Sequence, residues 1–163
     1  MSKVELNKKV KNFKLAATGE QNITLTSLKG QNVVLYFYPK DSTPGCTQEG
    51  LDFQASLAKF KRQNTIILGI SRDSIRSHEK FKNTQKYKFD LLSDEEEVLC
   101  TQFDVIKMKN MYGKKVRGIE RSTFLIDVNG KLRNEWRKVK VAGHVDDVLA
   151  AVKALNKAKL SRT

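Results

Sequence analysis

The residues most able to do chemistry lie in one stretch, YFYPKDSTPGCTQEG, at positions 36–50. It contains both prolines of the chain, Pro39 and Pro44, and one of its two cysteines, Cys46. The apolar run Val33–Tyr38 is typical of a buried strand, and the residues from Cys46 onward favour a helix. Cys46 is therefore expected in the first turn of a helix that follows a proline-stiffened loop. The helix dipole and the unpaired N–H groups of a first turn stabilise a thiolate, the nucleophilic form of cysteine. This predicts an activated cysteine, against the alternative of a small apolar residue that fills a helix–sheet interface.

Three further side chains suit a cysteine site. Thr43 carries a hydroxyl that can bind a sulfur-bound oxygen, although it can equally act as a helix N-cap. Glu49 can satisfy backbone N–H groups or orient an arginine, or it is a first-turn carboxylate that favours the helix dipole. Arg121 opens the apolar run RSTFLID and can offer a permanent charge with several donors, unless it is an ordinary surface arginine.

Together these residues resemble the peroxiredoxins. The pattern Pro39-x-x-x-Thr43-x-x-Cys46 matches the active-site motif of that family. The longer run LYFYPKDSTPGCT, with ERSTFLID downstream, is similar to the bacterioferritin comigratory protein, or peroxiredoxin Q, branch. The resemblance implies a thioredoxin-like fold and an antioxidant oxidoreductase with peroxidase activity. It also implies that Cys46 is the peroxidatic, redox-active cysteine, with Pro39, Thr43 and Arg121 as its catalytic partners.

The same resemblance implies how the site works. Thr43, Gly45 and Arg121 would bind the hydroperoxide, Glu49 would orient the arginine, and Cys46 would become a sulfenic acid. Thioredoxin, or glutathione with glutaredoxin, would then act as the thiol reductant. No metal, flavin or nucleotide cofactor is expected. The two histidines, His78 and His144, are interpreted as ordinary surface or helix-start residues.

The second cysteine, Cys100, raises the question of how a sulfenic acid would be resolved. Many members of the branch carry a cysteine five residues after the first, where this chain has Leu51. Others carry one near the segment SHEKFK, which has none here. Cys100 itself lies in a pattern typical of a buried helix face. The sequence therefore favours a one-cysteine cycle with an external thiol, and a two-cysteine cycle resolved by Cys100 is the alternative.

These residues must be positioned by a fold in which strands and helices alternate. The expected strands are Asn22–Thr26, Val33–Tyr38, Thr65–Ser71, Leu91–Leu92, Arg121–Asp127 and Lys131–Arg137. The expected helices are Cys46–Arg62, with Leu51, Ala55 and Ala58 on one face, Ser74–Lys86, Asp94–Phe103 and Val145–Lys157. This order predicts an α/β, thioredoxin-like fold with a mixed central sheet flanked by helices. The length of 163 residues fits a single domain over positions 1–163.

Composition limits the other functions. The net charge of +13 invites a nucleic-acid or acidic-surface binding module, but no nucleic-acid motif accompanies it and a solvated basic surface is the simpler interpretation. A disulfide oxidoreductase would carry Cys-x-x-Cys, whereas Thr47, Gln48 and Glu49 follow Cys46. A non-catalytic, chaperone-like role remains an alternative. The sequence predicts no membrane span and no secretory signal, so a cytoplasmic protein is expected. A monomer or weak dimer is the expected assembly.

Overall fold

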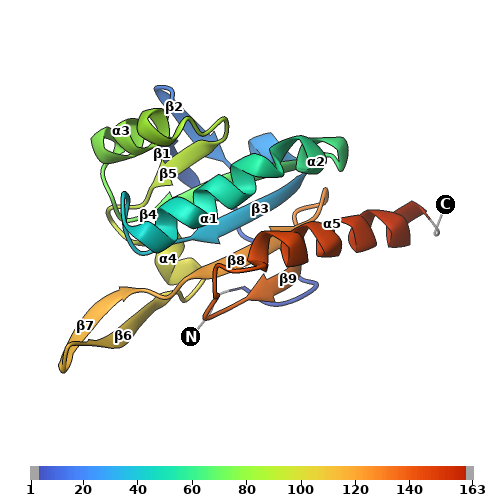
Figure 1. The fold of residues 1–163 in the computed structure, drawn as a ribbon. Coiled ribbons are helices and arrows are strands. Elements are labelled where there is room, and N and C mark those ends of the chain that lie inside the picture. Colours follow the sequence, from blue (N-terminus) through green and yellow to red (C-terminus); the bar gives the residue numbers. More distant parts are fainter. Residues whose placement is uncertain (1–3, 161–163) are drawn as a thin grey trace.

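The structure, a computed structural model, describes residues 4–160. Its centre is a mixed sheet of seven strands (Figure 1). In sheet order these are β2 (Gln21–Thr24), β1 (Lys14–Ala17), β5 (Asp90–Ser93), β4 (Thr65–Ser71), β3 (Asn32–Phe37), β8 (Ser122–Ile126) and β9 (Leu132–Trp136). Strands β3, β4 and β5 run parallel, whereas β8 is antiparallel to both β3 and β9, and β1 is antiparallel to β5. The predicted mixed α/β sheet is confirmed.

Helices cover both faces of this sheet, so that β3 is buried along its whole length. The helices are α1 (Pro44–Ala55), α2 (Leu57–Arg62), α3 (Ile75–Gln85), α4 (Val98–Gln102) and α5 (His144–Leu160), and a 3-10 turn, η1, spans Thr26–Leu28. Successive side chains of a strand point to opposite faces. Val34 and Tyr36 accordingly pack with residues of α1, α2, α3 and α5, whereas Leu35 and Phe37 pack with α4 and the N-terminal segment.

The expected helix over 46–62 is two helices, α1 and α2, which are separated at Ser56. The apolar face expected from Leu51, Ala55 and Ala58 is not the buried one, because all three residues are exposed. The buried residues of α1 are instead Cys46, Glu49, Gly50 and Phe53. The first turn of α1 therefore presents Cys46 and Glu49 to the interior together.

The acidic helix is shorter than the expected Asp94–Phe103, because α4 begins only at Val98. Glu97 has a left-handed backbone (φ 60°) and so ends the preceding turn. The Asp94 carboxylate lies outside the helix and accepts the N–H groups of Leu99 (3.2 Å) and Cys100 (2.7 Å). A negative charge therefore lies at the start of α4, but it comes from Asp94, which caps the helix from outside, and not from acidic residues within the first turn.

The sequence prediction lacks β1 and one further pair of strands. β6 (Ile106–Met111) and β7 (Lys114–Ile119) form an antiparallel hairpin that projects beyond the sheet (Figure 1). Its side chains are largely exposed, Tyr112 at the tip completely so. The alternation of apolar residues and lysines over residues 106–109 is a short strand signal that the sequence prediction did not use. Among residues 4–160, no helix has the length and apolar character needed to cross a membrane.

Candidate active site

Cys46 lies in the first turn of α1. Thr43 is the N-cap and Pro44 occupies the first helical position, where its missing N–H removes no hydrogen bond. Cys46 is only 2 % exposed. Its sulfur lies near the positive end of the dipole of α1, where the N–H groups of the first turn lack partners within the helix. The predicted position of Cys46, at a helix start after a buried strand, is confirmed.

Arg121 reaches this sulfur because of the sheet register. β8 is antiparallel to β3 and pairs Ser122 with Phe37, so Arg121 lies beside the carboxyl end of β3. The loop from Pro39 to Thr43 leaves β3 at that same end and leads to Cys46. The Nη2 atom of Arg121 lies 3.5 Å from the sulfur and donates to it. Residues far apart in the sequence therefore meet at the carboxyl end of β3.

Glu49 holds the other arm of the guanidinium. Nη1 of Arg121 donates to Oε1 of Glu49 at 2.7 Å, and the Glu49 side chain is fully buried. Burial raises the pKa of Glu49 to about 7, although Arg121 acts in the opposite direction. Burial likewise disfavours the charge on Arg121, but Glu49 and Cys46 outweigh this effect and raise its pKa. The guanidinium thus keeps its charge while it is fixed between a carboxyl group and the sulfur.

Gly45 allows this close approach. A Cβ atom at position 45 would lie 3.1 Å from Nη2 of Arg121, tighter than most side-chain contacts. A larger residue would push the guanidinium away from the sulfur. The structure therefore places Gly45 beside Arg121 and explains why a small residue stands immediately before Cys46.

Thr43 and Pro39 belong to the loop that precedes the helix. Thr43 occupies the N-cap position, but its hydroxyl makes no capping bond and instead donates to the carbonyl of Lys40 at 2.8 Å. Because the hydroxyl acts as donor in this bond, its oxygen keeps lone pairs that can accept another donor. Pro39 follows the buried strand and is half-buried. Both residues lie on the loop that leads to Cys46, as predicted.

Sequence reasoning missed Tyr87, which stabilises the first turn of α1. Its hydroxyl donates to the carbonyl of Thr47 at 3.0 Å. A Cβ atom at position 50 would overlap the Tyr87 ring, so Gly50 is what permits this packing. Tyr87 is far from Cys46 in the sequence, and no local signal connects the two.

Lys109 of the β6–β7 hairpin was also missed. Its ammonium donates to the carbonyl of Ile119. Burial and the positive charge of Arg121 lower the pKa of Lys109, whereas Cys46 acts in the opposite direction. The charge of Lys109 is thus coupled to those of Arg121 and Cys46.

The interpretation of the two histidines needs correction. His78 is fully buried within α3 and is not a surface residue. His144 does begin α5, as one of the expectations had it, but it is buried and its Nε2 lies 2.8 Å from the hydroxyl of Thr123. Burial lowers the pKa of His144 to about 4, so its ring is neutral at pH 7.

Cys100 lies on the other side of the sheet from Cys46. Cys46 packs with Val34 and Tyr36 on one face, and Cys100 packs with Leu35 and Phe37 on the opposite face. Both cysteines are free thiols. Burial, assisted by Asp94, raises the pKa of Cys100 well above its usual value, which keeps it a protonated and weakly nucleophilic thiol. The expectation of a buried Cys100 is confirmed.

Comparisons with known proteins agree on one family. Residues 6–135 match the family model described as AhpC/TSA family. A Xanthomonas campestris protein named peroxiredoxin Bcp is 58 % identical over 140 residues, which cover 86 % of this chain and 88 % of the relative. The Bacillus subtilis protein of the same name is 45 % identical over 153 residues, 94 % of this chain and 98 % of its own. A solved structure of the Xanthomonas campestris bacterioferritin comigratory protein superposes with a TM-score of 0.84 at 56 % identity, covering 88 % of this chain and 92 % of the other.

A buried cysteine that faces an arginine at the edge of a thioredoxin-like sheet defines a thiol-dependent peroxidase, an antioxidant oxidoreductase. The sequence expectation of a thioredoxin-like fold is confirmed by these structural neighbours. The chain belongs to the AhpC/TSA family of peroxiredoxins, in the branch of the Bcp and peroxiredoxin Q proteins. As a peroxiredoxin it takes a peroxide as substrate and a thiol as reductant.

Proposed function

We propose that Cys46 is the peroxidatic cysteine of a single domain spanning residues 1–163, with Pro39, Thr43 and Arg121 as its catalytic partners. The observation that carries the proposal is the guanidinium of Arg121, which donates to the Cys46 sulfur at 3.5 Å and to Glu49 at 2.7 Å. Because two bonds fix this planar group, its charge is directed at the sulfur without the freedom that a surface arginine has. Glu49 is the orienting residue in this arrangement.

The reaction begins when the thiolate of Cys46 attacks the terminal oxygen of a hydroperoxide, ROOH. An S–O bond forms and the O–O bond breaks, so that Cys46 becomes a sulfenic acid and two electrons pass from sulfur to oxygen. The leaving alkoxide or hydroxide takes up a proton and departs as alcohol or water. Arg121 stabilises the charge that develops on the leaving oxygen, and Thr43 with the backbone of Gly45 holds the peroxide in line. Pro39 shields the sulfur from water.

The positions of the two thiols support a one-cysteine cycle. Cys46 and Cys100 occupy opposite faces of the sheet, and a disulfide requires the two Cα atoms to come within about 7 Å. The position of Leu51 and the segment SHEKFK offer no thiol on the Cys46 side. An external thiol therefore captures the sulfenic acid, with release of water, and forms a mixed disulfide with Cys46. A second external thiol then attacks this mixed disulfide, so that Cys46 is released as a thiol and the two external thiols are joined in a disulfide.

The substrates are hydrogen peroxide and organic hydroperoxides, and the reductant is thioredoxin or glutathione with glutaredoxin. Alkyl peroxide reduction activity is ascribed to the Xanthomonas campestris bacterioferritin comigratory protein, which supports organic hydroperoxides as substrates here. The proposed location is the cytoplasm, where thiols stay reduced. The protein acts there as a monomer or a weak dimer, without a cofactor.

Mass mapping under non-reducing conditions, after one equivalent of peroxide, tests the cycle. We expect Cys46 to carry one added oxygen, or a mixed disulfide when a small thiol is present, and Cys100 to remain a free thiol. Cys100→Ser is expected to retain steady-state turnover within about twofold with either reductant. A stoichiometric Cys46–Cys100 disulfide, with turnover lost in Cys100→Ser, would instead assign the two-cysteine cycle.

A further inference from the structure

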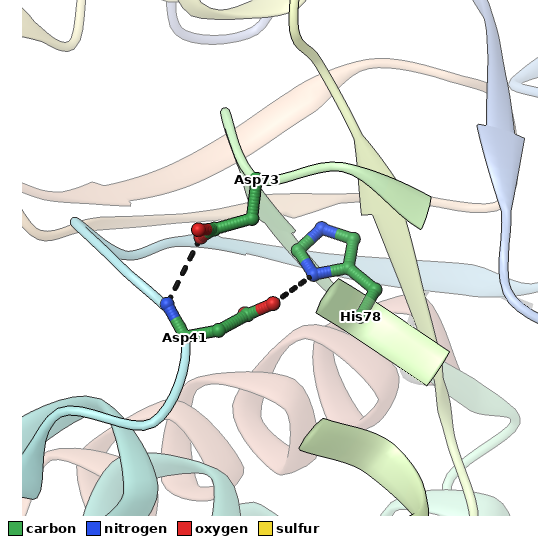
Figure 2. A group of neighbouring side chains, drawn as sticks. All are labelled: Asp41, Asp73 and His78. Carbon is green, nitrogen blue, oxygen red and sulfur yellow. Dashed lines mark hydrogen bonds and ion pairs between the residues drawn. The ribbon is translucent and has the colours of Figure 1, made fainter. Parts of the chain in front are cut away.

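A network of buried polar groups lies behind the loop that carries Thr43. Its centre is the carboxylate of Asp41, which is 6 % exposed and accepts three hydrogen bonds. Tyr38 donates to Oδ1, and Ser77 and His78 donate to Oδ2, each at 2.7 Å. The backbone N–H of Asp41 donates to Asp73 at 2.9 Å (Figure 2). Both the side chain and the main chain of Asp41 are therefore fixed.

The partner histidine is an imidazolium. His78 is fully buried, and its Nε2 lies 2.9 Å from the carbonyl of Leu92, which can only accept a hydrogen bond. Its Nδ1 faces the Asp41 carboxylate, which is also an acceptor. With Asp41 ionised, both ring nitrogens donate, and the hydrogen bonds assign a positive charge to the ring. A cation near the start of α3 opposes the dipole of that helix, so His78 depends on Asp41 for its charge balance.

The position of Asp41 determines the geometry of the catalytic loop. Ser42, the next residue, has a left-handed backbone (φ 63°), which a non-glycine residue adopts only when its surroundings hold it there. The carbonyl of Lys40, the preceding residue, accepts the hydroxyl of Thr43 at 2.8 Å. Fixing Asp41 therefore fixes both the turn at Ser42 and the orientation of the Thr43 side chain.

We propose that the Asp41–His78 ion pair positions the catalytic loop, so that Thr43 and Cys46 are held for reaction with peroxide. The pair joins the loop to the first turn of α3 and touches no reacting atom, so both members are positioning residues. The inference rests on the proposed role of Cys46. It adds that α3, which carries no cysteine here, contributes a buried charge that keeps the peroxide-reactive geometry in place.

The same side chains do not form a metal site in this arrangement. Asp41, Asp73 and His78 bring one ligand atom each within 4.8 Å of one another, which is near enough for a cation. However, both nitrogens of His78 and both carboxylate oxygens of Asp41 already have protein partners. A metal cation would have to displace a proton from His78 and break several of these hydrogen bonds. The positive charge that balances Asp41 is therefore that of His78.

The test measures two rates, that of Cys46 oxidation by hydrogen peroxide and that of trapping of its sulfenic acid by dimedone. Both are compared between His78→Leu, His78→Asn and the wild type. His78→Leu removes the donor to Asp41, whereas His78→Asn places a neutral amide donor near the Nδ1 position. We expect the second-order rate of Cys46 oxidation by hydrogen peroxide to fall on the order of 10–100-fold in His78→Leu, as small misplacements of reacting groups do. His78→Asn should recover part of this loss, because it restores the hydrogen bond to Asp41 but not the charge. Because Cys46 is 2 % exposed, trapping of its sulfenic acid by dimedone should become faster as the loop loosens.

Lys82→Gln is the matched control, because it breaks a different ion pair of α3, with Asp90, at the same distance of 2.7 Å. It should leave both rates unchanged. Equal oxidation rates in His78→Leu and the wild type would overturn the proposal, and so would no recovery in His78→Asn. If Cys46→Ser retained peroxide turnover, the proposed function itself would fail, which is a separate result.

A spectroscopic measurement on the unaltered protein keeps the proposal testable if His78→Leu does not fold. Nitrogen-15 NMR of the imidazole should show two slowly exchanging ring N–H groups for His78 at neutral pH. A single ring N–H group would overturn the assignment of an imidazolium. Titration with zinc chloride alone should give no stoichiometric site at His78, and a site that is lost in His78→Asn would overturn the ion pair.

Discussion

Replacing Arg121 with lysine separates its charge from its geometry. The guanidinium donates to Glu49 and to the Cys46 sulfur from two different nitrogens. A lysine ammonium keeps the positive charge, but its compact head cannot serve both partners in the same arrangement. The loss of one hydrogen bond to a charged group costs about 1.5–3 kcal/mol. We therefore expect the second-order rate of peroxide reaction to fall about 10–150-fold.

Stopped-flow measurement of Cys46 oxidation, at several pH values and in the absence of reductant, reads this step directly. Arg133→Lys provides the control, because Arg133 belongs to a separate ion pair, with Asp127 on the β8–β9 hairpin at 3.2 Å. It should leave the rate unchanged. If Arg121→Lys reacted within about twofold of the wild type across the pH range, the guanidinium geometry would have no part in the mechanism.

Two further substitutions test other parts of the site. Thr43→Val, which removes the hydroxyl but keeps the shape, should lower the rate of peroxide reaction on the order of 10–100-fold, while Thr43→Ser stays near the wild-type rate. Equal rates for the two variants would remove the hydroxyl from the mechanism. Burial raises the pKa of Glu49 to about 7 in the folded state, compared with about 4.5 in the unfolded state. Between these two pH values the folded protein holds a proton on Glu49 that the unfolded protein has released. The free energy of unfolding should therefore decrease by roughly 2–4 kcal/mol as pH rises through this window, and urea titrations should show a smaller decrease in Glu49→Gln. The same decrease in both proteins would contradict the raised pKa.

Much of the fold could be predicted because its central strands leave strong local signals. Thr65–Ser71 is a largely apolar run that matches β4 residue for residue. The pair Asn129-Gly130 marks the turn between β8 and β9, where Gly130 has a φ of 83°. The β6–β7 hairpin left a weaker signal, because an exposed ribbon buries no face and its apolar and basic residues alternate over only four positions, 106–109.

The candidate site could be predicted where its residues are close in sequence. Pro39, Thr43 and Cys46 share one loop and helix start, so their types and spacing were sufficient. Tyr87 and His78 contact this region only through the packing of α3 and the segment after it, and neither residue has a local pattern that indicates a role. Long-range contacts of this kind follow from the tertiary structure alone.

The most direct test of the central claim is peroxide consumption by Cys46→Ser. A serine hydroxyl remains protonated at neutral pH and cannot form a sulfenic acid. Measured with thioredoxin or with glutathione and glutaredoxin, the variant should show turnover at the background rate, while the wild type consumes peroxide. Turnover by Cys46→Ser above that background would contradict the assignment of Cys46 as the peroxidatic residue.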